Sequence, residues 1–575
     1  MVFAPKFLAF VAASLSLVGA AVLEERAPVD PCATIAGKKW VSPKEVRACY
    51  QSIKVDETLK ANIIEVVTKT LAFHASTNYQ IKAPQPFTND VHEDILATLA
   101  QIKSKKYASD YDLHIDLSRA FKRLNDGHVV WINRCYDSAF VNYLPIPLSL
   151  ITAKDGSQNV HISPEAFTVA TAEFPDQIQF WQDSLKWPLT GKLQSLAGAK
   201  VLLINGRPPF DAVNDNVAIA GSYQSFATRQ NGFFSSYQAT AAGWTYLLGQ
   251  FAQQSLPLSD NAVLTIQREG HLLPEIVILP YRSRIGSAIK PFTDGKSFFA
   301  NNCRAVPATN GQDIYASSIS AFSAPEDSER PVEEFQQQTP VPASVARKHP
   351  INVILDTQPL SDVVLPPTLA PGLPAAPGSR NAAQFYLLKD GKTGVLALGS
   401  FSDSNYDAFL NSLLQGLVSL KSQGATQLVV DVTNNGGGFI CAAHWLHRII
   451  IGPKSTTVPQ AGLDTEARNG PLAQLIVKEI INKNADPDNE LLYNPRQWRN
   501  AKNEVFNATD DWLQPPVKKI INGRADAFSQ RLGQECQPEA FPANVPDVGL
   551  FDPKKVVIVS NGRYVLRLQA PNPTG

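Results

Sequence analysis

The sequence lacks an excess of charge of either sign. Its 52 Lys and Arg residues balance 52 Asp and Glu residues, so the formal net charge at pH 7 is zero. A nucleic-acid partner would require a basic face, and this composition predicts none. Long hydrophobic runs are also scarce. After the first twenty residues no segment reaches about eighteen apolar residues, which excludes a transmembrane helix there and predicts no membrane partner.

The first twenty residues, MVFAPKFLAFVAASLSLVGA, are typical of a secretory signal peptide (residues 1–20). Lys6 precedes a short apolar run, and small residues close it, which predicts cleavage after Ala20. A membrane anchor is the alternative, but the run is short for a bilayer and Glu24 follows at once. We therefore expect a secreted, extracellular protein.

Cysteine is sparse, with six residues in the chain. An oxidising compartment favours disulfides. Cys32 and Cys49 are close in sequence and lie near the start of the first helical pattern, so we predict that they pair. The pairing of the others stays open; these are Cys135, Cys303, Cys441 and Cys536. The sequon Asn507-Ala508-Thr509 predicts one N-glycosylation site.

The patterns divide the chain into regions, as its length requires. Residues 31–140 are mainly helical, and residues 141–285 are dominated by strands. Residues 323–380 hold eleven of the 42 prolines, which predicts an exposed linker or long loop. From residue 384 to 575 strands and helices alternate, which predicts a parallel sheet with crossover helices. The expected class is a multidomain α+β protein.

The first region contains a helix with a clear apolar stripe. Leu113, Leu117, Phe121 and Leu124 recur at helical spacing, and the helix is predicted to end at Gly127. The letters HVVWI then predict a strand. In the last region, a hairpin is predicted across Asp390-Gly391, and VVIVS is predicted as a further buried parallel strand.

The stretch VVDVTNNGGGF places three glycines directly after a buried strand and before a helix. Such a turn exposes backbone N–H groups, which can bind a phosphate or an oxyanion. A phosphate site is disfavoured, because the stretch lacks both the GK[ST] ending and the G-x-G-x-x-G spacing. A tight turn without function is the simpler alternative.

Two further stretches contain residues with catalytic or metal-binding chemistry. His128, in LNDGHVVW, follows the predicted helix end, a position suited to a general base, although most single histidines have no such role. The stretch CAAHWLH contains Cys441, His444 and His447, whose spacing winds too far around a helix for one metal ion. A packed or disulfide-bonded Cys441 is the favoured interpretation.

Taken together, the motifs resemble one family. FKRLNDGHVVW, AKVLLINGRPPFDA, GVLALGSF, LVVDVTNNGGGF and KKVVIVSNGR occur in the order found in tail-specific, or C-terminal-processing, serine peptidases. The chain is especially similar to secreted fungal members related to the chlamydial protease-like activity factor. The resemblance implies a helical N-terminal region with the DGH motif, a PDZ-like mostly-β module over 141–285, and an α/β catalytic core over 384–575.

The resemblance also implies a mechanism. The DGH motif is similar to that of the Ser-His-Glu group, in which His128 would be the general base. Gly437 and Gly438 would belong to the oxyanion turn, with the Gly437 N–H as the expected donor. A peptide or protein substrate is implied, and neither a metal nor a cofactor. The PDZ-like module would bind extended peptide by strand addition.

The end of the chain departs from the family pattern. In the family, a nucleophilic serine follows the strand that resembles VVIVSNGR, and a glutamate comes later. After Ser560 this sequence contains no serine and no glutamate. We therefore expect an incomplete catalytic core and an inactive chain as written. A misread 3′ end of the gene is the favoured explanation, and a non-catalytic secreted peptide-binding protein is the alternative.

Overall fold

The computed structural model describes most of the chain between Val29 and Arg563. The described residues are 29–131, 133–240, 243–257, 259–286, 289–304, 363, 365–401, 403, 405–438, 440–452, 465–487, 491, 493–502, 504–533, 542, 546 and 548–563. The predicted signal peptide, Cys536 and most of the predicted proline-rich linker lie outside these residues.

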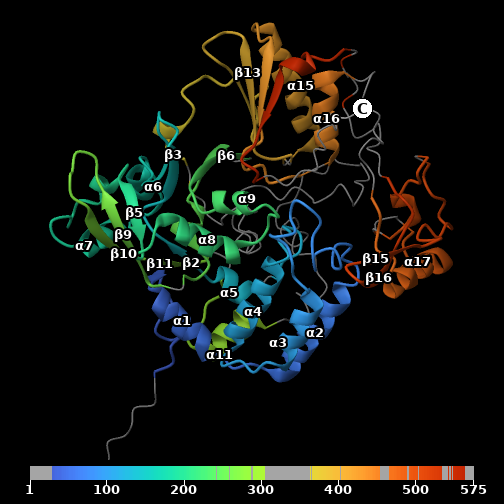
Figure 1. Cartoon of the computed structure of the whole chain (residues 1–575), viewed down its shortest axis with the longest axis horizontal. Coiled ribbons are helices and arrows are strands. Elements are labelled where there is room, and N and C mark those ends of the chain that lie inside the picture. Colours follow the sequence, from blue (N-terminus) through green and yellow to red (C-terminus); the bar gives the residue numbers. More distant parts are fainter. Residues whose placement is uncertain are drawn as a thin grey trace, which may run out of the picture.

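Helices dominate the N-terminal region, which is blue in Figure 1. They are α1 (Pro43–Ser52), α2 (Glu57–Thr70), α3 (Ile95–Ser104), α4 (Asp110–Lys122) and α5 (Arg134–Ser138). The first helix begins at a capping box, in which the Ser42 hydroxyl accepts from the Glu45 N–H while the Glu45 carboxylate accepts from the Ser42 N–H. The apolar stripe of α4 is buried against α2 and α3, as predicted.

The segment after α4 differs from the prediction in two ways. The helix ends at Lys122 rather than Gly127, and Asn125 adopts a left-handed φ of 52° that turns the chain. The predicted HVVWI strand is wrong over its described residues, which form a turn. The reason is a side-chain contact: the Trp131 indole donates to the buried His114 ring at 3.0 Å and stacks on it.

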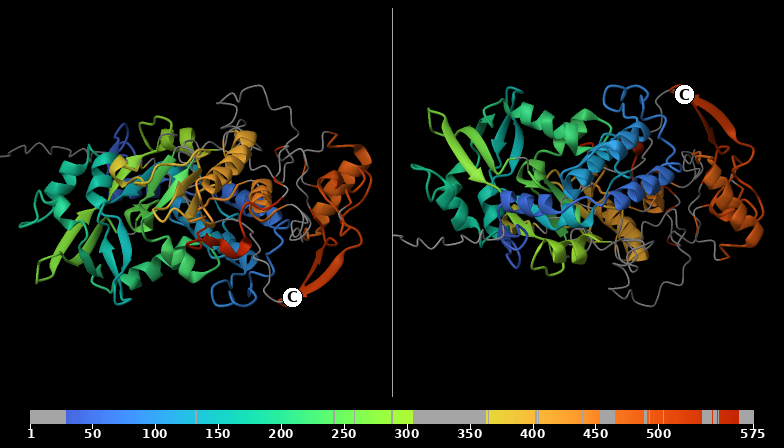
Figure 2. Two further views of the ribbon diagram at one scale, coloured as in Figure 1. Left: turned by 90° about the horizontal axis from the view of Figure 1, so that it is seen from above. Right: turned by 90° about the horizontal axis from the view of Figure 1, so that it is seen from below.

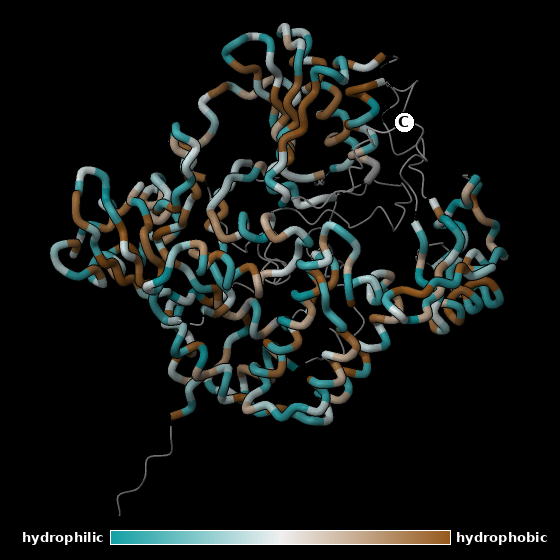
Figure 3. The backbone as a smooth tube through the Cα atoms, viewed as in Figure 1, coloured by the Kyte–Doolittle hydropathy of each residue, from teal (hydrophilic) through white to brown (hydrophobic). Residues whose placement is uncertain are grey.

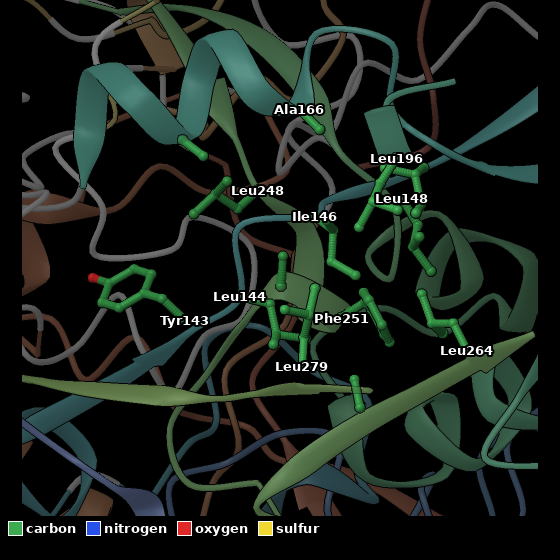
Figure 4. Close-up of a cluster of buried hydrophobic side chains, with 14 of the residues drawn as sticks. Tyr143, Leu144, Ile146, Leu148, Ala166, Leu196, Leu248, Phe251, Leu264 and Leu279 are labelled. Carbon is green, nitrogen blue, oxygen red and sulfur yellow. The ribbon is translucent and has the colours of Figure 1, made fainter. Parts of the chain in front are cut away.

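A five-stranded antiparallel sheet forms the second region. Its order is β10-β9-β5-β4-β3. The strands are β3 (Leu148–Thr152), β4 (Gln158–Ile162), β5 (Lys200–Ile204), β9 (Asn261–Gln267) and β10 (Glu275–Pro280). One face packs on the largest core, where Leu148, Leu264 and Leu279 converge (Figure 4). Helices α6 (Ala166–Glu173), α7 (Ile178–Ser184) and α8 (Pro209–Ala220) accompany this sheet. These strands lie in the region 141–285, which the sequence predicts to be rich in strands.

Shorter elements link this region to its neighbours. A small sheet joins β1 (Trp40–Val41), β11 (Arg282–Ile285), β2 (Phe140–Tyr143) and β8 (Gln253–Gln254). A separate hairpin pairs β6 (Ser236–Thr240) with β7 (Gly243–Leu247). The remaining short helices are α9 (Phe226–Asn231), α10 (Gly249–Ala252) and α11 (Gly295–Phe298). Disulfides join Cys32 to Cys49 and Cys135 to Cys303.

The third region is a four-stranded mixed sheet in the order β12-β13-β14-β17. Its strands are β12 (Ala383–Leu387), β13 (Thr393–Leu398), β14 (Gln427–Asp431) and β17 (Val556–Val559). The predicted hairpin between β12 and β13 and the parallel pairing of β13, β14 and β17 are confirmed. Helices α15 (Tyr406–Ser422) and α16 (Ile440–Ile451) pack beside these apolar strands, which are brown in Figure 3.

The last strand is not buried, which corrects the prediction for VVIVS. Val557 and Ile558 are each 57% exposed and Val559 is 42% exposed. The backbone of β17 pairs with β14, but it is an end strand of the sheet. Its alternating side chains therefore have little packed against them among the described residues.

An insertion between α16 and β17 forms a small unit with its own core around Trp498 and Trp512. Its regular elements are α17 (Pro471–Lys483), β15 (Val517–Ile521) and β16 (Arg524–Phe528). It docks on the N-terminal region: the Asn522 amide donates to the Asn78 carbonyl at 2.7 Å, and Arg524 pairs with Asp94. Figure 2 shows this unit at one end of the molecule and the five-stranded sheet toward the other.

The described end of the predicted linker is a loop whose start is buried. Residues 365–380 contain only one short helical turn, at Pro367–Leu369, but Val363 and Leu365 are buried in the core of the five-stranded sheet. The Tyr246 N–H donates to the Val363 carbonyl at 3.2 Å. Residues 367–377 are nevertheless mostly exposed, so this part is a largely exposed loop, within the prediction, whose start is anchored in the core. Among the described residues no helix has the length and apolar character to cross a bilayer.

Candidate active site

His128 lies in an exposed turn after α4. Its side chain is 62% exposed. The His128 N–H donates to the Asp126 carboxylate at 2.9 Å, and its Nδ1 lies 3.9 Å from the same oxygen. Asn125 anchors the turn because its amide donates to the Asp90 carbonyl at 2.8 Å. The imidazole is thus accessible to a substrate and lies near the Asp126 carboxylate.

A buried polar cluster lies under this turn. Trp131 donates to His114 Nδ1, which leaves the proton of a neutral ring on Nε2, 3.6 Å from Asp110. Tyr136 donates to the same carboxylate at 2.8 Å. Burial lowers the pKa of His114 to about 4 and raises the pKa of Asp110. These groups tie the end of the turn to α4.

The glycine-rich turn after β14 is held from inside by Asn435. Its amide donates to the Leu398 carbonyl at 2.8 Å, and its Oδ1 accepts the Gly437 N–H at 2.8 Å. The Gly436 N–H donates to the Gly399 carbonyl at 3.1 Å. Two of the three glycine amides are therefore already engaged.

The amides of the three residues before the glycines are engaged as well. The Thr433 N–H donates to the Asp431 carboxylate at 2.9 Å, and the Asn434 N–H to Asn561 Oδ1 at 3.3 Å. The Asn435 N–H donates to a carbonyl of the preceding strand end at 3.1 Å. Among the described residues, none of the hydrogen bonds uses the N–H of the half-buried Gly438.

Both last glycines need their lack of a side chain. Gly437 has a φ of 89° and Gly438 a φ of 131°, in the region that L side chains rarely adopt. The Gly437 carbonyl accepts the Phe401 N–H at 2.7 Å, which ties the turn to the segment after β13. The result is a rigid loop whose backbone can be approached closely.

The end of β17 lies beside this turn. Asn561 and Asn434 exchange hydrogen bonds: the Asn561 amide donates to Asn434 Oδ1 at 2.8 Å, and the Asn434 N–H donates back. Gly562 continues the turn with a φ of 77°. Residues that follow β17 in sequence therefore leave the sheet next to the glycine-rich turn.

One segment contacts both the His128 turn and the end of β17. At its start, Gly221 packs on the Lys122 backbone, and a Cβ added to Gly127 would lie 3.4 Å from the Ser222 carbonyl oxygen. At its end, in α9, the Asn231 amide donates to the Asn561 carbonyl at 2.8 Å. Residues 221–231 therefore connect the two parts of the candidate site.

Other predicted residues lie elsewhere. His444 and His447 are on α16, and the Cys441 side chain is outside the described part of the chain. The described residues contain no group of three or more His, Cys, Asp or Glu side chains that could hold a metal ion. Asn507, the predicted glycosylation site, is exposed in a turn of the insertion.

Sequence reasoning missed several residues that support the turn. Asn434 and Asn561 stand within motifs that were recognised, but their pairing spans more than a hundred residues of sequence. Gln238, whose amide reaches the turn from β6, occurs in a stretch without a recognisable motif. Only the positive φ of Asn434 has a sequence signal, since Asn is favoured there.

Comparisons with known proteins agree with these observations. Residues 392–523 match the family described as Peptidase family S41. Two relatives from Diaporthe leptostromiformis, the peptidase S41 family proteins phomP1′ and phomP1, are each 22% identical over 491 residues. The match covers 82% of this chain and 64% of each relative's length.

Two solved structures of mature CPAF are also similar. Each is 13% identical, with TM-scores of 0.36 for the lactacystin complex and 0.37 for the other crystal structure. The matches cover 74% and 80% of this chain, and 65% and 70% of those chains. The sequence matches show a peptidase S41 family domain over residues 392–523, as the motifs indicated, and a similarity to peptidase S41 family proteins over most of this chain.

Proposed function

We propose that this serine peptidase family member is secreted and cleaves peptide bonds by a Ser-His-Glu mechanism. In this proposal His128 is the general base, and the turn that contains Gly437 and Gly438 binds the oxyanion of the tetrahedral intermediate. The substrate is an extended peptide or an unfolded protein segment. The proposal extends the family assignment to a mechanism, a compartment and named residues.

The observation that carries the proposal is the hydrogen bonding of the turn. A backbone amide has one proton to donate, so an amide already bonded inside the protein is unsuited to bind an oxyanion. The Gly437 N–H is held by Asn435 Oδ1, which makes the Gly438 N–H the better donor. An amide in a preorganised turn stabilises developing charge without reorganisation, an effect worth about a hundredfold or more in kcat.

His128 suits the role of base because it is accessible and close to a carboxylate. A serine proton can be removed only by an imidazole that the substrate and the nucleophile can both approach. Asp126 limits the positions of the turn, because its carboxylate accepts the His128 backbone N–H. A glutamate elsewhere would orient the ring in the Ser-His-Glu arrangement.

The nucleophile is proposed to follow β17. The turn at Asn561 and Gly562 lies beside the glycine-rich turn, so a serine close to it in sequence would be near the oxyanion donor. The sequence from Asn561 to Gly575 contains no serine. We therefore expect the 575-residue polypeptide itself to lack hydrolytic activity, and the bare faces of β17 suit a covering helix.

The test uses two preparations, the 575-residue polypeptide and the protein purified from its natural source. Hydrolysis of an unfolded protein substrate is expected only from the natural protein, and the mass of its C-terminal peptide should reveal a serine after Arg563. His128→Ala should lower kcat by at least about a thousandfold. His92→Ala, at another exposed histidine, is the matched control. Parent-like rates in the His128 variant would refute the assignment.

A non-catalytic peptide-binding function is the second candidate. The five-stranded sheet ends in β3 and β10, so each has one edge without a partner strand among the described residues. An extended peptide could add to such an edge. Saturable binding of peptides by the 575-residue polypeptide, together with absent hydrolysis by the natural protein, would favour this candidate.

A further inference from the structure

The β6–β7 hairpin stands directly against the candidate oxyanion turn. At the end of β13, a Cβ added to Gly399 would lie 1.6 Å from the Ala239 carbonyl oxygen in β6. No side chain of any kind fits between these two backbones. In Figure 1, β6 lies between the five-stranded sheet region and β13. The hairpin therefore packs directly against the strand end that holds the turn, although it belongs to a different part of the sequence.

The contact is made specific by Gln238. This side chain is only 4% exposed. Its amide donates to the Asn434 carbonyl at 2.8 Å and to the Gly399 carbonyl at 3.3 Å. The Gly399 carbonyl also accepts the Gly436 N–H. Gln238 thus bridges the first half of the turn and the strand end on which the turn rests.

The Asn434 side chain of the turn also donates hydrogen bonds to the hairpin. The Asn434 amide donates to Ser236 Oγ at 2.8 Å and to the Tyr237 carbonyl at 2.7 Å. Its Oδ1 accepts from Asn561. Every polar atom of the Asn434 side chain is therefore occupied by the hairpin or by the end of β17.

These contacts determine the orientation of the next peptide units. The Asn434 carbonyl belongs to the peptide plane that leads into Asn435. Because Asn435 in turn holds the Gly437 N–H, a rotation of that plane would move the Gly437 amide and redirect the Gly438 N–H. A few tenths of an ångström matter there, since an oxyanion donor acts only at about 2.7 to 3.1 Å.

We infer that Gln238 is a positioning residue for the oxyanion turn, acting through Asn434. The inference rests on the proposed function, in which the turn stabilises the tetrahedral intermediate. Gln238 does not touch the substrate. Its amide donates both N–H groups to two carbonyls. These bonds fix the orientation of the Gly438 N–H.

A purely structural role for Gln238 makes different predictions. A residue that only stabilises the fold would lower the melting temperature and accelerate hydrogen exchange over the whole sheet. A positioning residue changes exchange at the turn and the turnover number, with KM nearly constant. The distinction is therefore between a local and a general effect.

The experiment replaces the amide without changing the length of the side chain. Gln238→Met removes both donors, and Gln158→Met, at an exposed glutamine of β4, is the matched control. Hydrogen exchange followed by mass spectrometry on the 575-residue polypeptide should show about tenfold faster exchange in peptides that cover 434–438. Exchange over β14 and the melting temperature should match those of the control.

A milder variant keeps the test valid if Gln238→Met fails to fold. Ser236→Ala removes one acceptor of the Asn434 amide, and it should accelerate exchange in the same peptides by a smaller factor. In the hydrolysing natural protein, Gln238→Met should lower kcat about ten- to a hundredfold while KM changes less than about twofold.

The outcomes separate this inference from the proposed function. Unchanged exchange at 434–438 in both variants, or an equal acceleration over the whole sheet, would overturn the positioning role. A loss through KM alone would overturn it as well. Absence of hydrolysis by the parent protein would instead overturn the proposed function, whatever the exchange at the turn shows.

Discussion

The two turns of the candidate site have a similar backbone conformation at their first residue, but they differ in the number of side-chain hydrogen bonds that hold this residue. Asn125 begins the His128 turn with a φ of 52°, and Asn434 begins the glycine-rich turn with a φ of 55°. Among the described residues, the Asn125 side chain makes one hydrogen bond, to the Asp90 carbonyl at 2.8 Å, whereas the Asn434 side chain makes three. The first turn carries an exposed imidazole, and the second is largely buried.

The difference follows from what each turn is proposed to do. A fixed dipole stabilises charge only if it is oriented before the reaction, which requires a rigid surround. A general base must reach a proton and release it, which an exposed side chain on a lightly held turn permits. The rigid turn is therefore built into a sheet and a hairpin, and the base stands at the end of a helix.

The largest expected effect on stability comes from adding a side chain between the β6–β7 hairpin and the end of β13, on which the glycine-rich turn rests. Gly399→Ala would place a methyl carbon 1.6 Å from the Ala239 carbonyl oxygen, so the backbone must move. We expect a loss of about 4 kcal/mol or more in the free energy of unfolding, measured by urea denaturation. Gly372→Ala, where a Cβ meets open space, should change stability by less than about 0.5 kcal/mol. Equal effects would show that the hairpin does not press on the turn.

The next effect concerns the polar cluster under the His128 turn. Burial lowers the pKa of His114 from about 6.5 to about 4 in the folded state. As pH falls below about 6.5 the unfolded chain takes up a proton first, so stability is lost progressively down to about pH 4. The loss should total about 3 kcal/mol. His114→Gln should remove this part of the pH dependence, whereas an unchanged pH profile would show that folding does not shift the pKa of His114.

A paired substitution compares the two turns directly. Asn434→Gly and Asn125→Gly both keep a residue that tolerates a positive φ, so only side-chain hydrogen bonds are lost. We expect about 3 kcal/mol for Asn434, which loses three bonds, and about 1 kcal/mol for Asn125, which loses one. Thermal unfolding of both variants measures the difference. Equal losses would contradict the assigned difference in support.

The smallest effect on stability is expected at His128. Because the side chain is mostly exposed, His128→Ala should change the free energy of unfolding by less than about 0.5 kcal/mol. Denaturant curves of the variant and of His92→Ala should coincide with that of the parent. A large loss would mean that His128 supports the fold and would weaken its assignment as a base.

The sequence predicted elements whose signal is local. The stripe of Leu113 and Leu117 and the Asp390-Gly391 hairpin follow from periodicity and turn chemistry, and both are observed. The glycine-rich turn was also found from sequence, since three glycines after a buried strand permit few other structures.

What failed depends on contacts between distant residues. The β-branched and aromatic letters of HVVWI favour a strand, but the stacking of Trp131 on His114 determines the local structure. The strand β17 pairs as predicted, yet nothing in its own apolar letters reveals that Val557 and Ile558 are exposed. Gln238 lies about two hundred residues from Asn434 in sequence, so no local pattern predicts their bond.

The central claim is that the two turns act as one catalytic site. A double-mutant cycle in kcat/KM for His128→Ala and Gln238→Met, on the natural hydrolysing protein, tests this most directly. Removal of a general base leaves the catalysis that the oxyanion turn supplies, so the loss caused by Gln238→Met should persist in the His128→Ala background. The double variant is expected to be about ten- to a hundredfold slower than His128→Ala alone. A double variant as fast as His128→Ala, or single variants that hydrolyse at the parent rate, would contradict the claim.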